Sequence, residues 1–278
     1  MLKFMRTIRS RFPASTVGSL RKAFLTNDVE GSIAAHAGRE KEHSSGSAAY
    51  ISDIVLGGID GIITTYAVVA SVVGADLSMG VIIVLGGANL FADGISMAVG
   101  NFLGATSLSR YHSSERSREL WEVENLPDHE REEIREIFAS KGFKGKLLDD
   151  VVAHITSDKE LWVETMMKEE LGIMEDRGNP VLAGFSTFTA FVLFGFIPLS
   201  IFCFAYLTGA NYSSTFLFTS ATVSTGLALF TVGAFKSRIT DESWIKSGSE
   251  TLITGGLAGA VAYFAGVMLK TLVRAPIG

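Results

Sequence analysis

Two long segments of this chain contain no charged side chain. Asp, Glu, Lys and Arg are absent from Gly178 to Phe235 and again from Thr251 to Leu269. An uncharged, largely apolar stretch of about 18 residues or more is typical of a membrane-spanning helix. The whole chain of 278 residues is 47% hydrophobic and 19% charged, with a single cysteine, Cys203. Together these features exclude a disordered chain, a secreted disulfide scaffold and a nucleic-acid-binding protein.

We predict an all-α polytopic membrane protein with five helices crossing a lipid bilayer. The spans are expected at residues 50–74, 78–108, 181–207, 215–235 and 251–272. The second segment is too long for the bilayer, because its 31 residues reach about 46 Å as a helix and the hydrocarbon core is about 30 Å thick. We therefore expect the second helix to project into the cytosol and to lead directly into the segment that follows.

The distribution of basic residues predicts the orientation. Lys and Arg occur in residues 1–49, in residues 109–178 and near the last span, whereas the short loops after the first and third spans have none. Cytoplasmic loops carry the excess of Lys and Arg, and a cytosolic N-terminus places 22 of the 24 basic residues inside. We expect a basic cytosolic tail, a C-terminus outside and a multi-pass position in a bacterial inner membrane.

An acidic insert separates the second and third spans. Residues 109–178 hold 18 acidic and 11 basic side chains, a net charge of −7, while the rest of the chain carries +2. Turn and capping residues predict helices at 110–124, 127–140, 147–156 and 158–172, the first continuous with the second span. The predicted organisation is a tail at 1–49, two spans at 50–108, a cytosolic helical insert at 109–178 and three spans at 179–278.

Carboxylates and methionines recur on the helical faces of this insert. The residues in this pattern are Glu115, Glu119, Glu122, Glu130, Glu133, Met166, Met167 and Glu170. A carboxylate face is usually a solvated helix surface. The adjoining methionines favour a divalent-metal site, because a cation relieves the repulsion between carboxylates and a thioether favours softer transition ions. His112 and His129 flank these helices, but no histidine spacing in the chain is typical of a zinc site.

Ionisable and polar side chains occur inside the first two spans. Asp60 lies ten residues into the first span, about 15 Å along the helix, where a buried carboxylate indicates function. Its neighbours Gly57, Gly58 and Gly61 permit close helix packing or a locally open backbone. A stripe at i, i+4 spacing in the second span comprises Asn89, Asp93, Met97 and Asn101. Oxygen and sulfur donors on one line, facing Asp60, are typical of a cation path. Asp53, nearer the cytosol, is compatible with headgroup exposure or with function.

Other chemistries lack support in the sequence. It contains no glycine-rich phosphate-binding loop and no Ser-His-Asp or Cys-His arrangement. We therefore expect neither an enzyme nor an ATP-driven pump, and no tightly bound cofactor.

Five stretches are specific when they are taken together. They are GGIDGIITTYAVVA, ADGISMAVGNFLGA, ELWEVE, HEREEI and WVETMMKEELG. With these stretches the chain resembles the vacuolar iron transporter family over residues 50–272, as a member of bacterial type. The resemblance implies a five-span homodimer that exports Fe²⁺, and often Mn²⁺, from the cytosol in exchange for protons. It also implies an ion path between the protomers and a cytosolic three-helix metal-binding domain.

By motif, the resemblance implies that Asp60 and Met97 are the aspartate and the methionine of the path. The implied ligands of the cytosolic domain are Glu119, Glu122, Glu130, Glu133, Glu170, Met166 and Met167. One position departs from the pattern, because plant-type members carry a glutamate where this chain has Asn89. Asp93 lies on the next turn of the same stripe. We interpret it as a metal-ligating carboxylate displaced by about 6 Å toward the cytosol.

The leading hypothesis is a proton-coupled exporter of Fe²⁺, with Mn²⁺ as a second transported ion. The insert collects the ion, Asp93, Met97 and Asp60 carry it across, and protonation from the outside releases it. Two alternatives stay open: a membrane-anchored metal buffer or sensor without transport, and an uncoupled channel.

Overall fold

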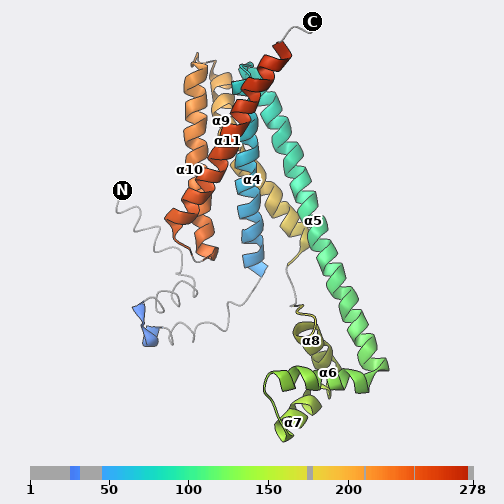
Figure 1. The fold of residues 1–278 in the computed structure, drawn as a ribbon. Coiled ribbons are helices and arrows are strands. Elements are labelled where there is room, and N and C mark those ends of the chain that lie inside the picture. Colours follow the sequence, from blue (N-terminus) through green and yellow to red (C-terminus); the bar gives the residue numbers. More distant parts are fainter. Residues whose placement is uncertain (1–25, 32–45, 174–177, 210, 241, 275–278) are drawn as a thin grey trace. The chain divides into compact units, whose positions relative to one another are not determined.

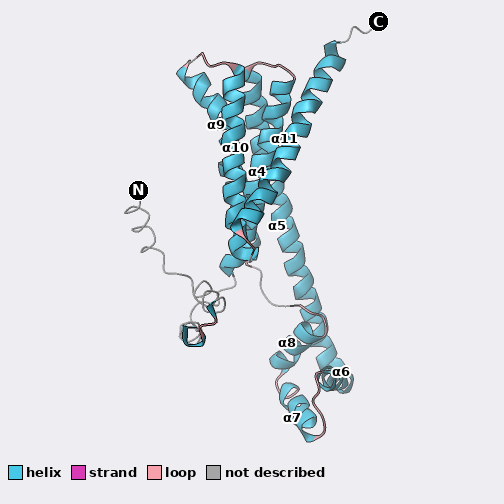
Figure 2. Ribbon diagram, turned by 60° about the vertical axis from the view of Figure 1, so that its left-hand side comes forward, coloured by secondary structure: helices cyan, strands magenta, loops and turns pink. Residues whose placement is uncertain are grey.

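The structure is a computed structural model that describes residues 26–31, 46–173, 178–209, 211–240 and 242–274. Every regular element in these ranges is a helix and none is a strand, which confirms the all-α prediction (Figure 2). The chain forms two units, Met1–Ser47 and Ala48–Gly278, and each is described by itself. Most of the expected basic tail, including His36 and His43, lies outside the described residues.

Five helices are long and apolar enough to cross a membrane, as expected. They are α4 (Gly46–Gly74), α5 (Met79–Asn125), α9 (Pro180–Thr208), α10 (Ser214–Thr240) and α11 (Trp244–Arg274). The predicted continuity of the second span with the insert is confirmed, because α5 is a single helix of 47 residues, about 70 Å long. Figure 1 shows the second half of α5 extending beyond the other long helices.

The insert adds three short helices at the far end of α5. They are α6 (Pro127–Ser140), α7 (Lys146–Ile155) and α8 (Lys159–Glu169). Pro127 occupies the first turn of α6, and the side chain of Asp158 caps α8 by accepting a 3.0 Å hydrogen bond from the Leu161 amide. The apolar faces of these helices meet the end of α5 in a buried cluster that includes Ile134 and Val163.

Several helix ends differ from the prediction, and two of these differences are explained by the local sequence. The last long helix begins at Trp244, well before the expected start at Thr251, because its first two turns are polar and lie outside the uncharged segment. Lys246 and Glu250 stabilise these turns by an i, i+4 ion pair of 3.8 Å. At the other difference, α8 ends at Glu169 and not near Gly172, since Gly172 has a left-handed φ of 65° that terminates the helix.

Glycines on α4 bring its backbone against α9. A Cβ on Gly57 would lie 2.5 Å from the carbonyl oxygen of Thr187, and one on Gly61 would lie 2.4 Å from that of Phe191. No side chain fits at these separations, so the close helix packing expected at these glycines is confirmed. This contact fixes the face of α4, and therefore the position of Asp60, relative to the rest of the bundle.

Candidate functional site

The polar stripe on α5 is connected internally. Asn89 donates a hydrogen bond of 2.7 Å from Nδ2 to Oδ2 of Asp93, one turn further along the helix. Asn89, Asp93 and Met97 are all half-buried. Asn89 therefore orients one carboxylate oxygen of Asp93 and leaves Oδ1 available to another group.

A second carboxylate lies on the neighbouring helix. Asp60 of α4 is half-buried and close enough to Asp93 for their negative charges to interact. Two carboxylates that repel each other inside an apolar bundle are unfavourable unless a proton or a cation is shared between them. The expected proximity of Asp60 to the stripe is thus present.

The end of the stripe nearer the insert takes part in a hydrogen-bond network that joins three helices. Asn101 of α5 donates from Nδ2 to Oδ1 of Asp53 on α4 at 2.9 Å and to Oγ1 of Thr187 on α9 at 2.7 Å. The amide of Asn101 is therefore committed to interhelical hydrogen bonds. Asp53 is half-buried and bonded to another helix, so it takes part in packing of the bundle in addition to any contact with headgroups. Thr187 had no sequence signal that would have singled it out.

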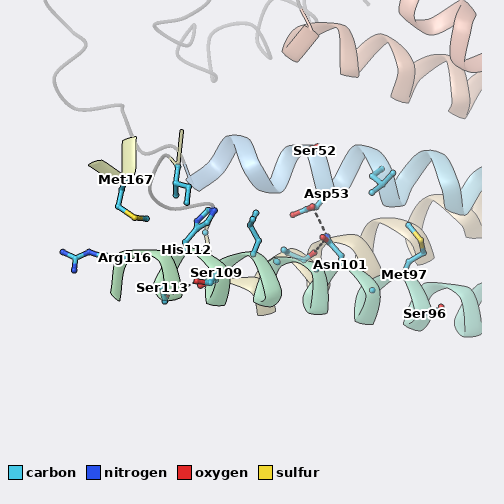
Figure 3. Close-up of a pocket in the computed structure, with 18 residues that line it drawn as sticks. Ser52, Asp53, Ser96, Met97, Asn101, Ser109, His112, Ser113, Arg116 and Met167 are labelled. Carbon is cyan, nitrogen blue, oxygen red and sulfur yellow. Dashed lines mark hydrogen bonds between the residues drawn. The ribbon is translucent and has the colours of Figure 1, made fainter. Parts of the chain in front are cut away.

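A cavity of about 860 Å³ joins the stripe to the insert. Met97 and Met167 line its two ends, and Asp53, Asn101 and His112 lie between them (Figure 3). The cavity therefore places the thioether of the candidate path and a thioether of the insert on one continuous surface. Sequence reasoning identified the two methionines separately and did not connect them.

The two deepest carboxylates of the insert are buried and incompletely paired. Glu119 on α5 is 1% exposed and Glu130 on α6 is 3% exposed. The Oε2 atom of each has no hydrogen-bond partner among the residues that the structure describes. An unpaired buried carboxylate oxygen is costly, so this pair is suited to a group that supplies positive charge.

The surrounding charges change the protonation of this cluster. Burial is the largest cause that raises the pKa of Glu130 to about 7, followed by the negative charge of Glu133 and then those of Glu122 and Glu170. The pKa of Glu170 is also raised, by burial first and by Glu133 next. The five glutamates predicted as ligands are therefore close enough for their charges to change one another's pKa. Their spacing in the sequence did not establish this proximity, because they come from different parts of the insert.

The two methionines of the insert have different surroundings. Met166 is fully buried in the apolar cluster of the insert, among Ile134 and Val163. Met167 is 7% exposed and borders the cavity. A ligand role for Met166 stays a prediction, while Met167 is the one of the pair that reaches open space.

Basic side chains also contact the acidic face of the insert. Across the described residues, no three His, Cys, Asp or Glu side chains converge as a group ready to hold a metal. Arg118 instead contacts the acidic face, with Nη2 at 2.9 Å from Oε1 of Glu119 and 3.0 Å from Oε2 of Glu115. His129 lies 3.4 Å from Glu133, through its Nε2 atom. Binding of a cation here requires these side chains to rearrange.

Comparisons with known proteins agree with this geometry. A sequence profile described as the VIT family matches residues 51–267. The chain is 37% identical over 270 residues to a protein named vacuolar iron transporter from Toxoplasma gondii, covering 92% of this chain and 89% of that protein. It is 34% identical over 260 residues to a protein of the same name from Plasmodium falciparum, covering 90% and 95%. With vacuolar iron transporter 1 of Arabidopsis thaliana it shares 31% over 227 residues, covering 81% and 87%.

These relatives bear on two further expectations. They are named as transporters, which agrees with the expectation that the chain is not an enzyme. They come from protists and plants, so they lend no support to a bacterial-type member or to a bacterial inner membrane.

Proposed function

This chain belongs to the VIT family, and on that premise we propose that it moves divalent transition-metal ions, Fe²⁺ and also Mn²⁺, out of the cytosol in exchange for protons. The observation that carries the proposal is the cavity between Met97 and Met167. It joins a candidate loading domain to a polar path inside the bundle. A buffer or sensor has no need of such a connection.

In the proposed cycle the insert collects the ion and the bundle carries it. Glu119, Glu122, Glu130, Glu133 and Glu170, with Met167 and Met166, supply the collecting groups. The ion then passes along the cavity to Met97 and to the carboxylates of Asp93 and Asp60. A thioether beside carboxylates favours transition ions over Mg²⁺ and Ca²⁺, which prefer oxygen alone.

Protons supply the release step of the cycle. Asp60 and Asp93 repel each other when both are charged, so a divalent cation and a pair of protons are alternative ways to neutralise them. Protonation of these carboxylates from the side opposite the insert lowers their affinity for the metal and frees it, since a ligand must be deprotonated to bind. The concentration of basic residues in the N-terminal segment and in the insert supports a cytosolic position for both.

We also propose that two copies of the chain assemble around the path. The half-buried polar stripe of α5 is bordered by large exposed apolar side chains, namely Val84, Leu85, Phe91, Ile95 and Val99. The apolar groups are equally compatible with lipid, but Asp93 and Asn89 on the same helix are not, because a carboxylate facing lipid is costly. A second copy covers the stripe and completes the path. Cross-linking of cysteines introduced at Ile95 in membranes tests this assembly.

Transport in sealed vesicles tests the function itself. Purified protein is reconstituted into proteoliposomes, and Mn²⁺ or Co²⁺ flux is followed together with internal pH. Exchange predicts metal movement that accelerates under an opposing proton gradient and carries protons the other way. Flux that is indifferent to the gradient indicates a channel, and metal binding without flux indicates a buffer or sensor; either result contradicts the proposal.

A further inference from the structure

Arg118 lies in the middle of the acidic face of α5. Its Nη2 atom is 3.0 Å from Oε2 of Glu115 and 2.9 Å from Oε1 of Glu119, and its Nη1 atom is 3.6 Å from Oε1 of Glu122. One guanidinium thus contacts three carboxylates spread over two turns of the same helix. Two of them, Glu119 and Glu122, belong to the proposed collecting groups.

The positive charge of Arg118 does not balance this cluster. Glu119 and Glu130 each keep one buried oxygen that lacks a partner among the described residues. The cluster also contains Glu133 and Glu170, whose negative charges act on Glu130. The single positive charge of Arg118 therefore leaves negative charge and unpaired carboxylate oxygens in the cluster that a divalent ion could use.

The position of Arg118 makes its contacts compete with a metal. The oxygens that it contacts, Oε1 of Glu119 and Oε1 of Glu122, belong to two of the proposed collecting groups. A metal ligand must offer its lone pairs to the ion, so these atoms cannot serve both cations fully at once. The side chain of Arg118 is 46% exposed, which leaves it free to swing into solvent when it is displaced.

Arg135, on α6 of the same insert, lacks this relationship. Arg135 contacts Asp149 at 2.7 Å and Glu132 at 3.6 Å, and neither is a proposed collecting group. Arg135 is thus an ordinary surface ion-pair residue of the same insert. It provides a matched comparison, because removing either arginine changes the net charge by the same amount.

We infer that Arg118 is a displaceable internal cation that competes with the transported metal for Glu119 and Glu122. It offsets part of the negative charge of the cluster when no ion is bound and lowers the affinity of the cluster for the ion, so that an ion is collected without being trapped. The inference rests on the proposed function, since it assigns a role to Arg118 at the proposed loading site.

Binding of Mn²⁺ to the full-length protein tests this inference. Trp121 and Trp162 lie in the insert, so a Trp244→Phe background gives tryptophan fluorescence that reports ions bound there. At about pH 8, Arg118→Gln is expected to bind Mn²⁺ roughly five- to tenfold more tightly than the parent, whereas Arg135→Gln binds with parental affinity. Arg118→Lys is expected to lie between the parent and Arg118→Gln, because an ammonium keeps the charge but not the fork of donors.

The possible results separate the inference from the proposed function. Equal or weaker affinity in Arg118→Gln overturns the competing role of Arg118, as does equal tightening in Arg135→Gln or an absence of Mn²⁺ binding in every variant. Tighter binding confined to Arg118→Gln supports it. If that tightening occurs in a protein that shows no metal flux in proteoliposomes, the transport proposal fails while the role of Arg118 stands.

Discussion

Asn89 donates a 2.7 Å hydrogen bond to Asp93, so the amide and the carboxylate of adjacent turns act as one unit on α5. At position 89 this chain has an asparagine where plant-type members of the family carry a glutamate. The amide orients a carboxylate that lies one turn away from the position where plant-type members carry a glutamate. In the proposed path, a carboxylate is therefore retained at a different depth along the helix.

The position of this carboxylate is testable by moving it. Asp93→Ala is expected to reduce metal flux at least tenfold, because Asp60 is left as the only carboxylate of the pair. Adding Asn89→Glu to Asp93→Ala returns a carboxylate to the stripe one turn away and is expected to restore part of the flux. Initial rates of Mn²⁺ transport in proteoliposomes measure both effects. Full activity of Asp93→Ala would show that the stripe carboxylate is dispensable.

The thioether of Met97 predicts a selectivity effect. Met97→Leu keeps an apolar side chain of similar size but removes the sulfur, so transport of the softer Co²⁺ is expected to fall several-fold relative to Mn²⁺. Competition between the two ions in one vesicle preparation gives this ratio directly. Met79→Leu is the control, since Met79 packs against an apolar cluster at the other end of the span. An unchanged ratio of Co²⁺ to Mn²⁺ transport in Met97→Leu would show that the sulfur atom does not contribute to selectivity.

The raised pKa of Glu130 predicts how the empty insert responds to pH. Its pKa of about 7 lies above the ordinary 4.5, so between these pH values Glu130 is protonated in the folded insert and ionised in the unfolded chain. The contribution of Glu130 to the free energy of unfolding is therefore fully present below about pH 4.5 and is lost as the pH rises through 7. The loss is at most about 3 kcal/mol. Metal binding changes in the opposite direction and strengthens as Glu130 loses its proton.

Hydrogen exchange of the α6 amides measures this response in the full-length protein. Without metal, protection of α6 is expected to be lower at pH 8 than at pH 6, and saturating Mn²⁺ at pH 8 is expected to restore it. Glu130→Gln, which is neutral at both values, serves as the comparison and should show a smaller pH dependence, because Glu119, whose pKa burial also raises to about 7, still titrates. Protection that rises with pH in the metal-free protein would contradict the assigned burial of Glu130.

The close contact between α4 and α9 predicts a position-specific loss of stability. A methyl group at Gly61 would lie 2.4 Å from the Phe191 carbonyl oxygen, so Gly61→Ala is expected to force the helices apart and to cost about 1–3 kcal/mol. Gly100→Ala, with no atom within 4 Å of the added carbon, is expected to be tolerated. Thermal unfolding in detergent compares the two, and equal midpoints would refute the tight contact.

Hydropathy and charge predict most of this fold, because segments in the bilayer favour apolar side chains and segments in water favour charged ones. The continuity of α5 followed from a segment that is too long for the bilayer and that has no proline before Pro127. The early start at Trp244 was missed because absence of charge marks where a helix is apolar and not where it begins. Helical geometry continues through polar turns such as those carrying Lys246 and Glu250.

The site was less accessible to sequence reasoning, because burial depends on contacts between helices. Spacing grouped Glu119 with Glu115, yet the structure buries Glu119 and leaves Glu115 partly exposed. Met166 and Met167 are adjacent in sequence, but one enters the apolar cluster and the other borders the cavity. Arg118 carried a local signal, since it lies three residues after Glu115 and four before Glu122, a spacing that favours ion pairs.

Asp60 is the residue at which the ion path and the transported proton are proposed to meet. The direct measurement is metal flux with simultaneous internal pH in proteoliposomes containing Asp60→Asn. Asp76→Asn is the control, because Asp76 is an exposed carboxylate that pairs with Lys270 at the end of the bundle. In Asp60→Asn, the rate of proton-driven metal flux is expected to fall about tenfold or more, and the accompanying proton movement is expected to fall with it. Asp76→Asn is expected to retain both. Unchanged proton-coupled flux in Asp60→Asn would contradict the proposed mechanism.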